Sequence, residues 1–248
     1  MSIAHPTGHY HFLKGGAPFS SGVIADPGYE IVRVTLGSAT EWCHGFDHIR
    51  SHLTGLGLEV TSLCAIELRA PAPMTLEEFR TFNVTYREKL SHWDLLVDGV
   101  NPVARTNVAP MYSPPVKTEL YAFSYTVPTD DPVSTFVISG AADSQKGKTP
   151  EERVVCFGQT DVDSMRKKAA FVVNLVEQRM LDLGGSWDSV SSTNFFSVHG
   201  MDGVIDGILG ALGPAAFRGT VWHHAWPPLV DLKLEMDARA IRQEIFAC

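Results

Sequence analysis

Two segments of the chain repeat the same order of residues that could do chemistry. Each has an Arg on a strand-like run, a turn with two prolines, and a second strand-like run that carries a Glu. The first copy holds Arg105 and Glu119, and the second holds Arg218 and Glu235. A guanidinium group binds a carboxylate through two parallel hydrogen bonds, and a nearby Glu can move protons on the bound molecule. The repeat therefore predicts catalytic Arg and Glu side chains that face each other across adjacent strands.

Such a pair suits hydrolysis of the carbon–nitrogen bond in an enamine or imine beside a carboxylate. This bond reacts with water unaided, so a protein needs only to bind the carboxylate, favour the imine form and deliver water with proton transfers. Burial would raise the pKa of the Glu side chain toward the working pH. We therefore expect an enzyme that uses no organic cofactor and no metal ion.

Side-chain alternation adds candidate substrate-binding residues on the two Arg strands. In the first copy Asn107 follows Arg105 on the same face. In the second copy the corresponding face carries Thr220, Trp222 and His224. If the substrate is a conjugated dicarboxylate, Trp222 would cover its planar chain and His224 would donate a hydrogen bond to it.

Histidines and cysteines give no strong sign of a metal site. His5, His9 and His11 lie in an N-terminal segment without nearby carboxylates or cysteines, so we interpret them as surface or packing residues. The cysteines are scattered without close pairing, which argues against a zinc site and a disulfide framework. They are Cys43, Cys64, Cys156 and Cys248.

The residues around both copies predict one order of elements, which is strand, helix, strand, helix, strand, strand. A capping box at Thr75 and Glu78 starts a helix, while Gly57 and Gly184 follow helices as C-terminal caps. In the first half we expect strands at 29–36 and 63–68, helices at 46–56 and 75–93, and the strands of Arg105 and Glu119. In the second half we expect strands at 135–140 and 191–198, helices at 164–183 and 201–212, and the strands of Arg218 and Glu235.

Composition sets the frame for these elements. The chain has 248 residues, 44% hydrophobic and 19% charged, which is enough for one large or two small domains. A polar, Pro-bearing stretch at 128–132 predicts two domains, residues 1–128 and 129–248. The net charge of −8 argues against nucleic acid as a partner. No apolar run approaches the roughly 20 residues that span a bilayer and no signal peptide is evident, so we expect a cytoplasmic protein without membrane contact.

These residues resemble the RidA family of reactive-intermediate deaminases, also called the YjgF-like family. The first half carries Ala17–Val23, in which Phe19 replaces the usual Tyr, together with Gly37, Asn83, Ala104-Arg105-Thr106 and Glu119-Leu120-Tyr121-Ala122. The second half carries Ser139-Gly140, Phe217-Arg218 and Glu235-Met236-Asp237-Ala238. The resemblance implies an α+β fold of two tandem chorismate-mutase-like domains, each a mixed sheet covered by two helices on one face.

The resemblance also implies roles for individual residues. Arg105 and Arg218 would bind the carboxylate of a small anionic substrate, and Glu119 and Glu235 would position or activate water. Phe19, Gly37, Asn83 and Gly140 would line pockets between subunits of a homotrimer or a hexamer. The second half has no counterpart of Phe19 or Asn83, so the halves are expected either to build one composite site or to hold one working and one degenerate site.

Within this family, the two-copy length and the run 101–110 resemble deaminases of the 2-aminomuconate type. These release ammonia from ring-cleavage products of aminophenols in the breakdown of nitro- or chloronitroaromatics, and chloro derivatives are included in the prediction. Three alternatives stay open: a chorismate-directed hydrolase, a non-catalytic metabolite-binding protein on the same fold, and Arg–Glu pairs that are structural only.

Overall fold

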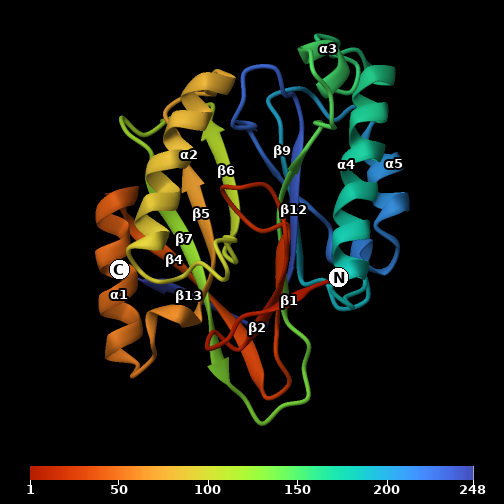
Figure 1. The fold of residues 1–248 in the computed structure, drawn as a ribbon. Helices are drawn as coiled ribbons and strands as arrows, with labels where there is room; N and C mark the ends of the chain where they lie inside the picture. The colour runs from red at the N-terminus through yellow and green to blue at the C-terminus, as the bar shows by residue number, and fades with distance from the viewer. Residues whose placement is uncertain (248) are drawn as a thin grey trace.

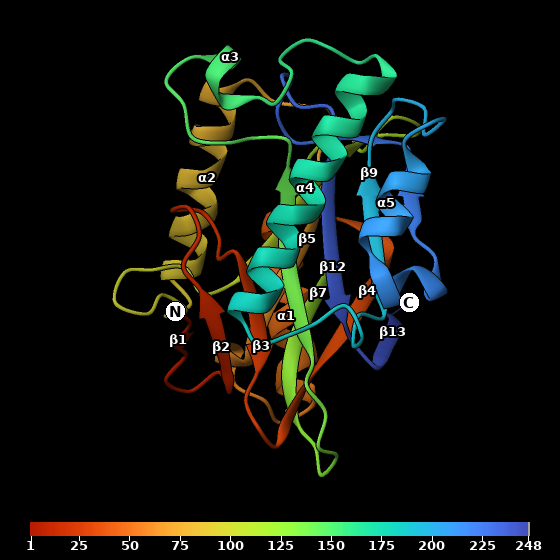
Figure 2. The same ribbon diagram turned by 90° about the vertical axis from the view of Figure 1, so that its right-hand side faces the viewer.

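The computed structural model describes residues 1–247, and two β-sheets lie between two pairs of helices. Helices α1 (Trp42–Gly55) and α2 (Leu76–Ser91) cover the outer face of one sheet. Helices α4 (Val162–Asp182) and α5 (Ile205–Ala211) cover the outer face of the other (Figure 1, Figure 2). The prediction of an α+β fold with two helices on one face of each mixed sheet is confirmed.

Each sheet contains both parallel and antiparallel pairs. The first sheet has the order β11-β6-β5-β7-β4-β13, with β5 parallel to β6 and β4 parallel to β13. Its strands are β4 (Tyr29–Glu41), β5 (Leu63–Arg69), β6 (Ala104–Pro110), β7 (Glu119–Pro128), β11 (Ala225–Trp226) and β13 (Gln243–Ala247). The second sheet has the order β1-β2-β3-β8-β12-β9-β10, with β9 parallel to β10. Its strands are β1 (Ile3–Ala4), β2 (Tyr10–Leu13), β3 (Gly22–Ala25), β8 (Phe136–Ala142), β9 (Ser192–Phe196), β10 (Val221–His223) and β12 (Glu235–Ala240).

The two sheets exchange strands between the halves of the sequence. Strands β1, β2 and β3 from the first half extend the second sheet through β8, and β13 and β11 from the second half extend the first sheet. A division at residue 128 follows the end of β7, but both sheets cross it. The halves are therefore interlocked by main-chain hydrogen bonds as well as by packing.

The helices begin and end where their local sequence signals are. At the start of α2 the Thr75 hydroxyl accepts from the Glu78 amide and the Glu78 carboxylate accepts from the Thr75 amide, so the predicted capping box is confirmed. Gly57 and Gly184 follow α1 and α4 at φ of 71° and 84°, a region that glycine adopts without strain. The remaining short helices are η1 (Val60–Ser62), α3 (Pro150–Arg153) and η2 (Gly213–Arg218).

Each helix pair packs against its sheet through a separate hydrophobic core. The apolar face predicted for α4 is buried, with Met165, Ala169, Val172, Val176 and Met180 all in the second core. The inner faces of the sheets meet through a smaller apolar cluster and through buried polar contacts. Thr106 donates to Asp237 across this interface at 2.8 Å, and Asn194 donates to the same carboxylate at 2.7 Å.

The prediction of a strand at Arg218 is wrong. Gly213-Pro214 starts the helix η2, which ends at Arg218, and Gly219 at φ 72° turns the chain before β10 begins at Val221. Pro214 is the second residue of η2, and Pro is favourable in the first turn of a helix because its ring fixes φ and an amide there has no partner within the helix.

Strand register shows which residue of the second half corresponds to Arg105, and it is not Arg218. In the first sheet, Arg105 on β6 pairs with Ile66 on β5. The last residue of β5, Arg69, lies three residues further on and pairs with Glu119 on β7. In the second sheet Phe196 pairs with Glu235, so Thr193 corresponds to Ile66. Val221 pairs with Asn194, and the Thr220 hydroxyl donates to the Thr193 carbonyl. Thr220 thus holds the register position of Arg105, and the second copy lacks an Arg there.

Two further expectations concern cysteines and membranes. Cys43, Cys64 and Cys156 are free thiols, whereas Cys248 lies outside the described residues. Among the described helices, none is both long and apolar enough to cross a bilayer.

Candidate active site

A cavity of about 270 Å³ opens between the two halves and is lined by residues from both. The first half contributes Arg105 and Asn107 from β6, Phe79 from α2, and Gly16, Phe19 and Ser21 from the segment before β3. The second half contributes Gly140 and Ala142 from β8 and Ser144 just after it, Leu175 and Arg179 from α4, the loop residues Pro228, Leu229 and Leu232, and Glu235 from β12. One pocket therefore combines the Arg of the first copy with the Glu of the second.

Arg105 is held in this cavity by aromatic rings and by one amide. Its guanidinium carbon lies 4.7 Å from the ring centre of Phe19 and 4.5 Å from that of Tyr86, and it donates from Nη2 to the Asn83 side-chain oxygen at 2.7 Å. Burial lowers the pKa of Arg105 to about 10, so the group still carries its charge at neutral pH. Its Nη1 is buried and has no hydrogen-bond partner among the described residues. A buried donor without a partner costs free energy, and an anion in the cavity would satisfy it.

Asn107 lies next to Arg105 on the same face of β6, as strand alternation predicts. Both polar atoms of its side chain are buried, and the described residues provide no partner for either. Native proteins rarely leave buried amides unpaired, so these atoms are free to bind a polar ligand.

Glu235 starts β12 and is buried at the floor of the cavity. Burial, and then the nearby Asp237 carboxylate, raise the pKa of Glu235 to about 8, while Arg105 and Arg179 act in the opposite direction. The protonated form of Glu235 therefore predominates at neutral pH in the empty cavity, and the group can both give and take a proton near the working pH.

Gly140 lies beside this carboxyl group in an irregular part of β8. A Cβ at residue 140 would overlap Oε1 of Glu235 and would lie 3.0 Å from its Cδ. The register of β8 on β12 shifts at this point, between Met236 and Ala238. The absence of a side chain at Gly140 thus gives the Glu235 carboxyl group its place.

Arg179 is a cavity residue that the sequence pattern did not identify. It comes from α4, and its Nη1 donates to the carbonyl oxygens of Ser139 at 3.1 Å and Gly140 at 3.4 Å. Burial lowers its pKa to about 10. Its spacing from Val172 and Val176 puts it on the apolar face of the helix, and a charge on such a face is the signal that could have found it.

The structure does not bring the other predicted site residues to this cavity. Arg218 is exposed at the end of η2, and Gly37 is exposed in β4. Glu119 starts β7 and pairs with Glu41 and Arg69. Arg218 is displaced because η2 replaces a strand in the second half. Glu119 is on β7, which β5 separates from the Arg105 strand β6, and it does not line the cavity.

Trp222, Thr220 and His224 also lie outside the cavity. The Trp222 ring packs on the second hydrophobic core, stacks on Phe195 at 6.0 Å, and donates to the Ser197 carbonyl. His224 is exposed and stacks on Tyr112 at 5.3 Å. The prediction of one strand face carrying Arg218, Thr220, Trp222 and His224 is wrong, because only Trp222 of these lies in β10, and its side chain packs on the core under α4 and α5.

Comparison with known proteins identifies the family. Residues 2–245 match the family described as 2-aminomuconate deaminase CnbZ. The chain belongs to the CnbZ family. It is 36% identical over 248 residues to 2-amino-5-chloromuconate deaminase from Comamonas testosteroni, with 98% of each chain covered.

Solved structures with similar folds share little sequence with this CnbZ-family chain. A chorismatase is 13% identical, with a TM-score of 0.49 and coverage of 89% of this chain and 77% of the other. A member of the YjgF/YER057c/UK114 family from Mycobacterium tuberculosis is 15% identical, with a TM-score of 0.27 and coverage of 44% and 79%. A cyanuric acid hydrolase is 9% identical, with a TM-score of 0.40 and coverage of 88% and 69%.

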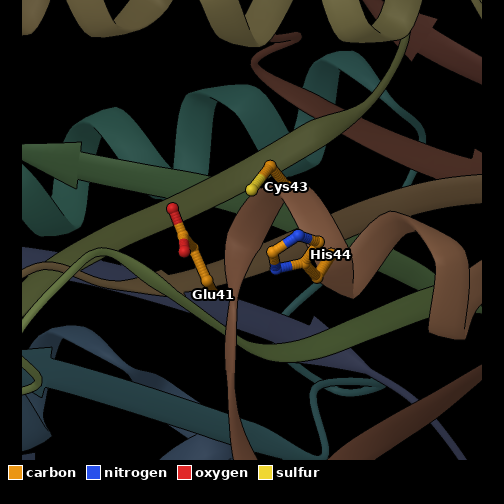
Figure 3. A group of neighbouring side chains, drawn as sticks. All are labelled: Glu41, Cys43 and His44. Atoms are coloured by element: carbon orange, nitrogen blue, oxygen red, sulfur yellow. The ribbon is translucent and has the colours of Figure 1, made fainter.

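One group of metal-ligating side chains lies elsewhere in the CnbZ-family chain, at the junction of β4 and α1. Figure 3 shows Glu41, Cys43 and His44 there, and their ligand atoms lie within 4.8 Å of one another. The carboxylate of Glu41 forms an ion pair with Lys117 at 3.0 Å, so a metal ion would have to displace an ammonium group. None of the three residues lines the cavity, and we assign them no part in its chemistry.

Proposed function

We propose that this chain is a hydrolytic deaminase that releases ammonia from 2-aminomuconate or its 5-chloro derivative, with Arg105 and Glu235 as its catalytic residues. One observation carries the proposal: in a member of the CnbZ family, a buried Arg with one unpaired guanidinium nitrogen and a Glu with a raised pKa line the same cavity. Membership of the family supplies the substrate class, and the two side chains supply the chemistry.

Arg105 would hold the carboxylate next to the carbon–nitrogen bond. Its Nη2 is fixed by Asn83, which leaves the unpaired Nη1 and the cavity-facing side of the guanidinium for the ligand. The rings of Phe19 and Tyr86 pack on the guanidinium and limit its movement. A rigid guanidinium group places the reacting carbon in one position relative to Glu235.

Glu235 would move the protons. In its neutral form it protonates the enamine on carbon, which converts the substrate to the iminium ion (the protonated imine). The resulting carboxylate then takes a proton from water as the water oxygen bonds to the iminium carbon. Return of that proton to nitrogen breaks the carbon–nitrogen bond as the new hydroxyl group gives its proton to the Glu235 carboxylate. Substrate and one water thus give the 2-oxo acid and ammonia, and Glu235 is neutral again. A carboxyl group with a pKa of about 8 suits both directions of transfer.

The remaining cavity residues would shape and orient the substrate. Asn107 offers an unpaired amide for a substrate oxygen or for the attacking water. Gly140 gives the Glu235 carboxyl group room, and Phe19 covers one side of the bound molecule as well as Arg105. Leu175, Leu229 and Leu232 form an apolar wall that would accept a chlorine substituent.

We include in the proposal a cytoplasmic location, as expected from the sequence, and assembly into a homotrimer or a dimer of trimers, as the family resemblance implies. Sedimentation equilibrium of the purified protein tests the assembly, and a monomer at micromolar concentration would contradict it. The cavity already combines both halves of one chain, so the proposed chemistry does not depend on that outcome.

The experiment is direct. The purified protein is mixed with freshly prepared 2-aminomuconate, and ammonia and the 2-oxo product are measured against the uncatalysed reaction. The expected result is a rate of ammonia release that is proportional to protein concentration and far above the background. Parallel incubation with chorismate tests the alternative hydrolase: pyruvate formation without ammonia release from 2-aminomuconate would contradict the proposal.

A further inference from the structure

The cavity is lined by two guanidinium groups, one buried and one half-buried, that have no ion-pair partner among the described residues. Arg105 approaches from β6 and Arg179 from α4, and within residues 1–247 neither has a carboxylate at ion-pair distance. Glu235 is a carboxyl group that interacts electrostatically with both arginines, but its raised pKa keeps it mainly neutral at pH 7. The protein's own groups therefore leave close to two positive charges in this cavity without a compensating carboxylate.

A second cavity, between the sheets, also contains several arginines, but these are paired with carboxylates. Its volume is about 290 Å³. There Arg33 pairs with Glu67 at 2.6 Å, Arg69 lies 3.7 Å from the same residue, and Arg239 pairs with Glu244 at 2.8 Å. The arginines of this second cavity are thus neutralised by carboxylates of the protein itself, which is the ordinary behaviour of buried charge.

We propose that Arg179 binds a second carboxylate, so that the site takes a dicarboxylate held at both ends and discriminates against enamines with a single carboxylate. This inference rests on the proposed function and adds the group that reads the far end of the substrate. Arg105, Arg179 and Glu235 line the same cavity, so the proton-transfer group shares it with both guanidinium groups. A dianion in this position would balance both guanidinium groups at once.

The local contacts of Arg179 leave part of its fork free for a ligand. Nη1 donates to the main-chain carbonyls of Ser139 and Gly140, which fixes the direction of the group. No hydrogen bond from Nε or Nη2 to another described residue is present. A guanidinium oriented by main-chain oxygens loses little freedom when it binds a carboxylate, and fork geometry favours a planar acid.

The test compares two acids that cannot be deaminated. Muconate has a carboxylate at each end, and sorbate has the same conjugated chain with only one. Binding of each is measured by calorimetry for the wild-type protein, for Arg179→Gln, and for the control Arg218→Gln, which changes an exposed Arg outside the cavity. Thermal unfolding of each variant checks the fold.

The expected result is selective. Wild-type protein and Arg218→Gln bind muconate roughly 10- to 100-fold more tightly than sorbate, as expected for one extra hydrogen-bonded charge. In Arg179→Gln muconate affinity falls to near that of sorbate, and sorbate affinity changes less than about threefold. Equal loss for both acids would mean that Arg179 only supports the main chain of β8, and it would overturn the inference, as would equal wild-type affinities.

Two further outcomes separate this inference from the proposed function. Muconate preference that depends on Arg179, in a protein that releases no ammonia from 2-aminomuconate, would support the inference and refute the function. Ammonia release with no preference for muconate would do the reverse. If Arg179→Gln does not fold, Arg179→Lys keeps the charge but loses the fork, and a selective but smaller loss of muconate affinity is expected.

Discussion

The carboxyl group of Glu235 occupies the space that a side chain at Gly140 would fill. A Cβ there would overlap Oε1 of Glu235 and would lie 3.5 Å from the Cα atom of Thr106. The position of the Glu235 carboxyl group in the cavity therefore depends on the lack of a side chain at Gly140.

Replacing Gly140 with Ala is expected to remove activity while the fold remains. The methyl group must push the Glu235 carboxyl group aside, and a displacement of about 1 Å at a reacting group can cost about 100-fold in rate. We expect kcat/KM to fall by about that factor. The control is Gly207→Ala on α5, where a Cβ meets nothing within 4 Å and activity should not change. Unchanged activity of Gly140→Ala would contradict the placement of Glu235.

The pH dependence of activity should report the pKa of Glu235. The first proposed step needs its neutral form, which is lost as pH rises through about 8. We expect kcat/KM to be level below that pH and to fall about tenfold per unit above it. A profile whose only transition lies near pH 4.5 would show that Glu235 titrates like an exposed carboxyl group.

The stability of the ligand-free protein should also fall at alkaline pH because of Glu235. The pKa of Glu235 is about 8 in the folded protein and about 4.3 in an unfolded chain, so its favourable contribution is full below pH 4.3 and is lost as pH rises through 8. Glu235→Gln cannot ionise. In the ligand-free protein, its free energy of unfolding should exceed that of the wild type by about 1.4 kcal/mol more for each pH unit within this window. Urea unfolding at several pH values measures the difference, and parallel curves for the two proteins would contradict the raised pKa.

Asn83→Ala is expected to weaken substrate binding through Arg105. The change removes the oxygen that accepts from Nη2 at 2.7 Å, so the guanidinium is no longer held in direction. A hydrogen bond to a charged group contributes about 1.5–3 kcal/mol, which corresponds to an increase in KM of roughly tenfold or more. Asn174→Ala, at an exposed position of α4, is the matched control and should leave KM unchanged.

Lys168→Met is expected to destabilise the second half. Lys168 is fully buried and its Nζ lies 2.7 Å from Asp143, whose other oxygen accepts from the amides of Lys233 and Leu234, just before Glu235. Removing the lysine leaves a buried carboxylate unpaired, at a cost of about 3–5 kcal/mol. Chemical denaturation measures the loss, and a second change of Asp143→Asn should recover part of it. A loss below about 1 kcal/mol for the single variant would show that Asp143 is not charged there.

Local signals in the sequence predicted most elements correctly. The capping box at Thr75, the glycines after α1 and α4, and the apolar face of α4 all act within a few residues, so they could be recognised without the fold. Arg218 was misplaced because Phe217-Arg218-Gly219 alternates like a strand. Phe217 is 94% exposed and Gly219 has a positive φ, neither of which alternation reveals.

The site itself depended on contacts between the halves. Arg105 and Glu235 belong to different copies of the repeat, and the packing of one sheet on the other brings them together. A composite site was one of two arrangements that the diverged copies allowed, but the partners could not be paired from local periodicity. Arg179 and Lys168 share one signal that the sequence does offer, since both are charged residues on the apolar face of α4. Their different roles follow only from the three-dimensional structure, in which Lys168 pairs with Asp143 and Arg179 lines the cavity.

The most direct measurement compares ammonia release from 2-aminomuconate by four single variants. Arg105→Gln and Glu235→Gln change the composite cavity, whereas Arg218→Gln and Glu119→Gln change the same residue types outside it. We predict that the first two lose activity by at least about 100-fold and that the last two stay within about threefold of the wild type. Full activity of Arg105→Gln and Glu235→Gln, or loss of activity only in Arg218→Gln and Glu119→Gln, would contradict the account.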